Sequence, residues 1–120
     1  MRESTLWILH ILAAVVILVA LGIHFAIMHL DYLMSVLGAG GGDVLAYASV
    51  IDRSEALSHT VIYIVLLATA LYHGFYGLRS ICYELPLGRA LEKTVDIASI
   101  VAGFGFFFWG AYAVIAGFLA

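Results

Sequence analysis

Residues 56–80, "ALSHTVIYIVLLATALYHGFYGLRS", decide the fold, because apolar and aromatic residues fill this stretch and Arg79 is its single Lys, Arg, Asp or Glu residue. A helix needs about 20 mostly apolar residues to cross the roughly 30 Å hydrocarbon core of a membrane. Inside lipid the backbone must satisfy its own hydrogen bonds, which favours a helix for a segment of this length. We therefore predict a transmembrane helix over residues 56–80.

The rest of the chain has the same apolar character. Of its 120 residues, 65% are hydrophobic and 11% are charged. A domain of this length cannot bury so much apolar surface, so its solvent must be lipid. Residues 6–30 and 95–119 form two further runs of spanning length. The predicted fold class is an all-α membrane protein, with residues 1–120 forming a single anchor domain of three transmembrane helices.

Some classes of protein and site are excluded by charge and cysteine content. The formal net charge of −3 argues against nucleic acid as a partner. A single cysteine, Cys82, excludes an internal disulfide and any iron–sulfur or zinc site built from several cysteines of this chain. Iron–sulfur chemistry, if the protein takes part in it, belongs to a partner subunit.

The ends of the first run raise two alternatives. Residues 6–30 could be a signal peptide, but the run is long for an h-region and contains three histidines, so we expect it to be retained. After it, "GAGGGD" (residues 38–43) could suggest phosphate binding. No strand precedes it and no long helix follows, so we predict a turn. The short apolar piece "VLAYASVI" (residues 44–51) is expected to lie along the membrane interface.

Basic residues predict the orientation. Arg53 stands alone on the side of the first connection. The other side carries Arg2, Arg79, Arg89 and Lys93. Because lysine and arginine accumulate in cytoplasmic loops, we predict a cytoplasmic N-terminus, an outer C-terminus and a multi-pass location in the cytoplasmic membrane.

Histidines are the main chemical signal. His10 and His24 are fourteen residues apart, and so are His59 and His73. Fourteen residues make nearly four helical turns and a rise of about 21 Å, so each pair lies near one face with one histidine towards each surface. In antiparallel helices this places His10 level with His73, and His24 level with His59. Facing imidazoles hold haem iron in b-type cytochromes, which makes these residues candidate haem ligands.

His73 is the strongest candidate, since ionisable groups inside a span are functional by default. Gly77 follows it by one turn, so a flat macrocycle or another helix can approach there. His10 and His59 lie near the ends of their runs, where the alternative is an interfacial imidazole. His24 and His29 are five residues apart and point to different faces.

Arg79 lies at the predicted cytoplasmic surface, just after the apolar part of its run. Its guanidinium can pair with a carboxylate such as a haem propionate, or donate to a quinone carbonyl. The alternative is simple snorkelling to lipid phosphates. The third run contains no charge after Asp96, and we predict packing, lipid contact and an interfacial aromatic belt for it rather than chemistry.

The segment "LYHGFYGLRSICYEL" (residues 71–85) resembles the motif YH-x-x-x-G-[IL]-R-H-x-x-x-D of the cytochrome b membrane anchor subunit of succinate dehydrogenase and fumarate reductase, respiratory complex II. Glu84 stands where that family has Asp. The matching residues are Tyr72, His73, Gly77, Leu78 and Arg79. The resemblance extends to three spans, a cytoplasmic N-terminus and His10 in "ILHIL" (residues 8–12).

This resemblance implies a haem-binding anchor that carries electrons between an iron–sulfur subunit and membrane quinone. His73 would be an axial ligand of haem b, with His10 and Arg79 near a propionate or the quinone pocket. One or two haems would be shared with a second membrane anchor subunit, and a flavoprotein would complete the oxidoreductase. A second haem would use His24 or, less favoured, His29. The rival layout binds both haems within this chain.

The sequence departs from the family at the quinone site. Ser80 replaces the usual His after the Arg. Trp7 and Ile11 replace the Ser and Arg that commonly flank the first-span histidine, so Ser4, Thr5 and partner residues are the alternative quinone contacts. Two other functions stay open from the sequence. One is the cytochrome b anchor of another quinone-linked enzyme, such as a hydrogenase or formate dehydrogenase, and the other is a haem-free structural membrane protein.

Overall fold

The computed structural model describes residues 2–38 and 46–119, and this part of the chain is helical, with no strand. The remaining part of the predicted glycine turn, residues 39–43, lies outside the described residues. Gly38 is inside them and has a φ of +72°, a left-handed conformation that glycine adopts at little cost at the end of a helix. The elements in chain order are α1 Glu3–Phe25, the π-helix η1 Ala26–Leu30, α2 Asp31–Val36, α3 Tyr47–Ser54, α4 Leu57–Tyr83 and α5 Arg89–Leu119.

Three of these helices, α1, α4 and α5, are long and apolar enough to cross a membrane, which confirms the predicted fold class. Their bounds differ from the apolar runs. The first predicted span, 6–30, is divided between α1 and η1, and α5 begins six residues before the predicted 95. The earlier start of α5 arises because an apolar run marks the hydrocarbon core, whereas a helix continues into the polar headgroup region.

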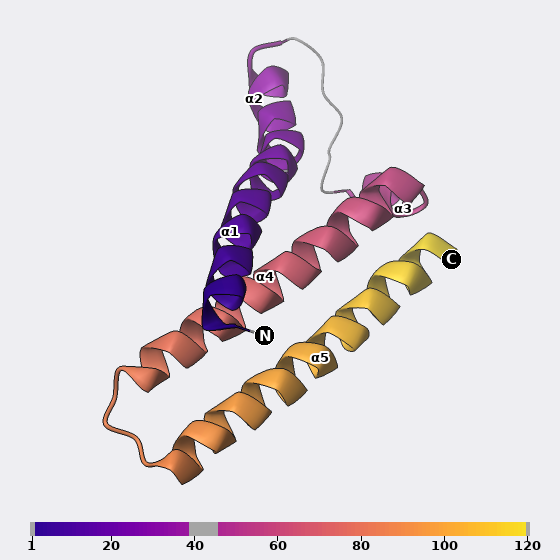
Figure 1. The fold of residues 1–120 in the computed structure, drawn as a ribbon. Coiled ribbons are helices and arrows are strands. Elements are labelled where there is room, and N and C mark those ends of the chain that lie inside the picture. Colours follow the sequence, from indigo (N-terminus) through magenta and orange to yellow (C-terminus); the bar gives the residue numbers. More distant parts are fainter. Residues whose placement is uncertain (1, 39–45, 120) are drawn as a thin grey trace.

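The helices form an open arrangement rather than a parallel bundle (Figure 1). Helices α4 and α5 run antiparallel and side by side, joined by a short hinge at residues 84–88 that contains Pro86. Helix α1 packs against α4, crosses it at a wide angle and then diverges from it. We call the end of the molecule where α1 begins and α4 meets α5 the hinge end, and the opposite end the loop end.

Little of the described chain is buried. Of the side chains that the structure describes, only Ala13 and Thr60 are buried. Large apolar residues are instead exposed: Leu18 by 75%, Phe108 by 66% and Trp109 by 76%. Such a surface is stable in lipid or against other apolar helices, and not in water. The chain is therefore a multi-pass membrane protein.

At the loop end, α3 lies against both α4 and α5 (Figure 1). It includes most of the apolar piece predicted over residues 44–51, of which residues 44 and 45 lie outside the described ranges. Tyr47 at its start is 81% exposed. Its place along the membrane interface stays a prediction.

Glycines set the close approach of α4 and α5. A Cβ atom on Gly110 would lie 2.7 Å from Cδ2 of Leu67, and one on Gly103 would lie 3.5 Å from Cδ2 of Phe75. Phe75 also stacks on Phe106 at a centroid distance of 6.3 Å. Small residues at a membrane helix interface allow this van der Waals packing, which is what holds apolar helices together in lipid.

The contact at Gly110 gives a prediction with a matched control. Gly110→Ala is expected to lower the free energy of unfolding in detergent by about 1 kcal/mol relative to Gly105→Ala, because Leu67 must move to admit the methyl group. Gly105 is the control because a Cβ there meets nothing within 4 Å. Equal unfolding midpoints for the two variants would contradict this account of the α4–α5 contact.

Candidate functional site

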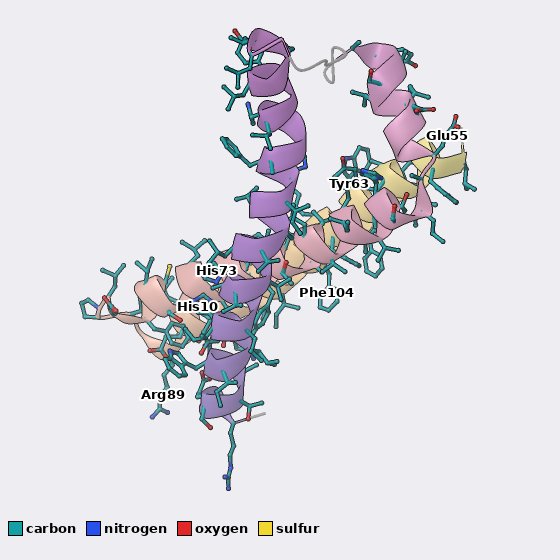
Figure 2. All side chains as sticks on the ribbon, turned by 90° about the horizontal axis from the view of Figure 1, so that it is seen from above. His10, Glu55, Tyr63, His73, Arg89 and Phe104 are labelled. Carbon is teal, nitrogen blue, oxygen red and sulfur yellow. The ribbon has the colours of Figure 1, made fainter. Side chains whose placement is uncertain are left out.

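His10 of α1 and His73 of α4 face each other where the two helices cross (Figure 2). Their ring centroids are 4.0 Å apart and the ring planes differ by 3°, so the imidazoles are stacked. Tyr76 lies 5.0 Å from the His10 ring and completes one side of the group. The prediction that His10 and His73 lie side by side on neighbouring helices is confirmed.

The His73 ring is oriented by the backbone of α1. Its Nδ1 lies 3.3 Å from the carbonyl oxygen of His10. In the tautomer with a proton on Nδ1, this atom donates to that oxygen and leaves the lone pair of Nε2 available. Histidines that bind metals are commonly oriented in this way, by a hydrogen bond from the other ring nitrogen.

The His10 ring is enclosed between α1 and α4. Its Nδ1 is shielded from solvent and has no hydrogen-bond partner in the described part of the chain. A Cβ on Gly77 would lie 3.5 Å from Cε1 of His10, so the space over this glycine is filled by α1. Of the two predicted uses of Gly77, approach by another helix is the one observed. The Tyr72 hydroxyl adds a second link between the helices by donating to the carbonyl oxygen of Leu6 at 2.8 Å.

The stacked pair limits how haem can fit. Carbon atoms in optimal contact are about 3.5–4.0 Å apart, so rings at 4.0 Å leave no layer between them for a macrocycle. His10 and His73 therefore do not fit as opposite ligands of one haem in this arrangement, against the layout that holds both haems in one chain. His73 has a hydrogen-bond contact through Nδ1, and none is seen for its Nε2 among the described residues, so this nitrogen could hold a metal.

A second group of histidines lies nearer the loop end, around Tyr63 of α4. The His24 ring is 5.9 Å from the Tyr63 ring, edge to face, and the His59 ring is 6.3 Å from it. His24 and His59 therefore have one neighbour in common, and their shared level in the membrane stays a prediction. Nδ1 of His59 is shielded and without a hydrogen-bond partner among the described residues.

His29 lies apart from this group. It is on the π-helix η1, and its ring packs on Phe25 at a centroid distance of 4.5 Å. His24 and His29 thus have different neighbours, as their spacing predicts. Among the side chains that the structure describes, no three His, Cys, Asp or Glu residues converge as a metal site.

Arg79 is the centre of a charged cluster at the hinge end. Its Nε donates to Oδ1 of Asp96 on α5 at 2.6 Å, and its Nη1 and Nη2 face the carboxylate of Glu3 on α1 at 3.5 and 3.3 Å. Its guanidinium carbon lies 4.4 Å from the centre of the Tyr83 ring. The cluster formed by Glu3, Arg79, Tyr83 and Asp96, which we call the arginine cluster, links all three spans.

Sequence reasoning missed the partners of Arg79. Asp96 is the last charged residue of the chain and lies inside an apolar run, which is itself a signal of function or pairing in a membrane span. The prediction of packing and lipid contact for the third run stays a prediction, to which the structure adds the ion pair between Asp96 and Arg79. Ser80, in the place of the family's His, donates to the carbonyl oxygen of Tyr76 at 2.9 Å.

These observations place a histidine pair with an orienting carbonyl and an arginine cluster next to it in three membrane-spanning helices. The chain is similar to a succinate dehydrogenase membrane anchor. It is 24% identical over 110 residues to the succinate dehydrogenase hydrophobic membrane anchor subunit of Archaeoglobus fulgidus, which covers 92% of this chain and 86% of that protein. This similarity supports a relationship to succinate dehydrogenase membrane anchors, but not to their cytochrome b subunit in particular.

Two other comparisons found nothing. No family model matches the chain, and no solved structure matches it.

Proposed function

We propose that the chain is the membrane anchor of a succinate dehydrogenase complex. The observation that carries this proposal is the similarity to the Archaeoglobus anchor subunit, which extends over nearly the whole of both proteins. The three apolar helices and their exposed apolar side chains support the proposal, because an anchor holds its partners at the membrane through such helices. The anchor would lie in the cytoplasmic membrane and contact a flavoprotein, an iron–sulfur subunit and a second anchor subunit.

The finer proposal is that the anchor is a cytochrome b, with His73 holding the iron of haem b through Nε2. The contact of its Nδ1 with the His10 carbonyl at 3.3 Å supports this assignment, since in the tautomer with a proton on Nδ1 it orients the ring and leaves the lone pair of Nε2 available. Two imidazoles stacked face to face at 4.0 Å cannot both hold the same iron, so a second protein ligand would have to come from the second anchor subunit. When bound, the haem supplies reversible one-electron transfer. The His10 ring would cover one face of the His73 ring.

A second haem is proposed towards the loop end, shared with the second anchor subunit. His24 is its ligand and His29 the less favoured alternative, because His24 lies in a group that also contains His59 and Tyr63, whereas His29 packs on Phe25. His59 would line this second site.

Electron transfer with membrane quinone is proposed for the hinge end, on the predicted cytoplasmic side. Arg79 provides a fixed positive charge there, which stabilises a negative oxygen where water is scarce. Asp96 and Tyr83 orient its guanidinium. Ser4 and Thr5 are exposed and follow Glu3 directly in the first turn of α1, so they lie at the same end of the molecule as Arg79.

Purification of the complex through a tag on this chain tests the proposal. We expect a flavoprotein with covalent flavin and an iron–sulfur subunit to copurify, succinate to reduce quinone, and a reduced-minus-oxidised spectrum to contain the α-band of haem b. The extracted haem per complex decides between one site and two.

The alternative functions predict different preparations. Hydrogenase or formate dehydrogenase subunits in place of the flavoprotein would contradict the proposed complex. Copurification of the flavoprotein without any haem would keep the anchor role and refute the cytochrome b role.

A further inference from the structure

The two ion pairs of Arg79 are unequal. The Nε contact with Asp96 is 2.6 Å, a short charge-assisted hydrogen bond, whereas the Nη2 contact with Glu3 is 3.3 Å. The Glu3 side chain is 68% exposed and that of Arg79 is 20% exposed. An ion pair with one partner in water contributes little to stability, so Glu3 is weakly held.

The guanidinium keeps its orientation without Glu3. Asp96 receives both the Arg79 Nε–H and the Tyr83 hydroxyl, the latter at 2.7 Å on the same Oδ1. The Tyr83 ring then covers one face of the guanidinium at 4.4 Å, a distance that allows a cation–π interaction. These contacts come from α4 and α5, and they leave the two terminal nitrogens facing α1.

We propose that the two terminal nitrogens of Arg79 form a binding site for the carboxylate or phosphate of an external ligand, and that Glu3 occupies this site until the ligand displaces it. The geometry of the occupant indicates the ligand chemistry: Nη1 faces Oε2 and Nη2 faces Oε1, which is the paired arrangement that guanidinium makes with two oxygens of one anion.

Exchange is favoured over simple addition by the charge of the arginine cluster. Glu3 and Asp96 each contribute −1 and Arg79 contributes +1, which gives a formal net charge of −1. An added anion would bring the cluster to −2, and like charges repel strongly where the dielectric constant is low. Replacement of Glu3 keeps the cluster at −1 and releases the Glu3 carboxylate into water. Glu3 is the first residue of α1, so its side chain can leave without unfolding the helix, and a carboxylate there still interacts favourably with the helix N-terminus.

The ligand has two possible sources with this one chemistry, a haem propionate and a lipid phosphate. The propionate source rests on the proposed function, and the lipid source does not. The test uses the haem-free complex, purified through this chain with its second anchor subunit and placed in phosphatidylcholine nanodiscs, because the proposed haem site is shared between the two anchors. One arm titrates haem b against its dimethyl ester, which has the same macrocycle without free carboxylates. The other arm adds phosphatidylglycerol to the nanodiscs and counts, by native mass spectrometry, the phosphatidylglycerol molecules retained per chain.

Glu3→Gln is expected to bind the displacing anion about two- to fivefold more tightly than the unchanged chain, which is the range for an exposed ion pair, and Arg79→Gln to bind it more weakly. Glu92→Gln, which removes a carboxylate from the first turn of α5 at the same end, is the control and is expected to have no effect. Tighter haem binding with an unchanged dimethyl ester identifies a propionate, and greater phosphatidylglycerol retention identifies a lipid phosphate.

Unchanged haem affinity and unchanged lipid retention in Glu3→Gln would overturn the exchange. If neither haem nor its ester binds any variant, the haem part of the proposed function fails, and the lipid arm alone decides whether Glu3 covers an anion site.

Discussion

Replacing His73 with alanine is expected to remove at least one haem b from the purified complex and to abolish its share of the α-band. His73 is proposed to bind iron directly, and loss of an axial ligand cannot be compensated by His10, whose stacked ring lies against the face of His73 at 4.0 Å. The measurement is the reduced-minus-oxidised spectrum together with extracted haem per complex. His29→Ala is the control for the haem held by His73 only, because its ring packs on Phe25 away from the pair and His29 is a less favoured candidate for the second site.

A second variant separates ligation from packing. His73→Gly leaves a cavity next to the His10 ring, and imidazole added to the buffer is expected to restore the α-band if the missing group was a ligand. An α-band and midpoint potentials unchanged in His73→Ala would refute the assignment. Loss of the band that imidazole does not restore would point to packing of α1 on α4 instead.

Arg79→Leu is expected to slow succinate-driven quinone reduction about tenfold or more, while succinate oxidation with an artificial dye acceptor stays near normal. The reason is the loss of a fixed cation at the proposed quinone end, where a single donor to a negative oxygen commonly accounts for at least this factor. Arg89→Leu is the control, since Arg89 is an exposed residue at the start of α5 at the same end (Figure 2).

Arg79→Lys is expected to restore only part of the rate. The guanidinium uses Nε for Asp96 and both terminal nitrogens for Glu3, whereas an ammonium group has no planar fork with which to keep both sets of contacts. If Arg79→Leu leaves quinone reduction and haem potentials unaltered, the arginine serves only to hold the three spans together or to contact lipid.

The spans and the levels of the histidines were predictable from the sequence because both depend on simple repeats. An apolar run of membrane length has one stable solution in lipid, and α4 follows the predicted 56–80 with small differences at its ends. Fourteen-residue spacing on two antiparallel helices brings His10 and His73 to one height, and the structure places their rings in contact.

Details that depend on how helices cross were not predictable. Helix α1 fills the space over Gly77 because the two helices cross there, and no pattern in the sequence encodes the crossing point. The same applies to the pairing of Arg79 with Glu3, 76 residues away, and with Asp96, 17 residues away. The π-helix at Ala26–Leu30 has no periodic signal either, since its wider turn continues the same apolar run.

The wide crossing of α1 over α4 makes α1 a lever with its pivot at His10. From there to Phe25 is fifteen residues, an arm of about 22 Å, so a tilt of about 10° at the pivot moves the far end of the helix by about 4 Å. The pivot itself is fixed by the stacked imidazoles and by the Tyr72 hydroxyl on the Leu6 carbonyl. A subunit that wedges between α1 and the α4–α5 pair therefore sets the position of His24 with little disturbance of His73.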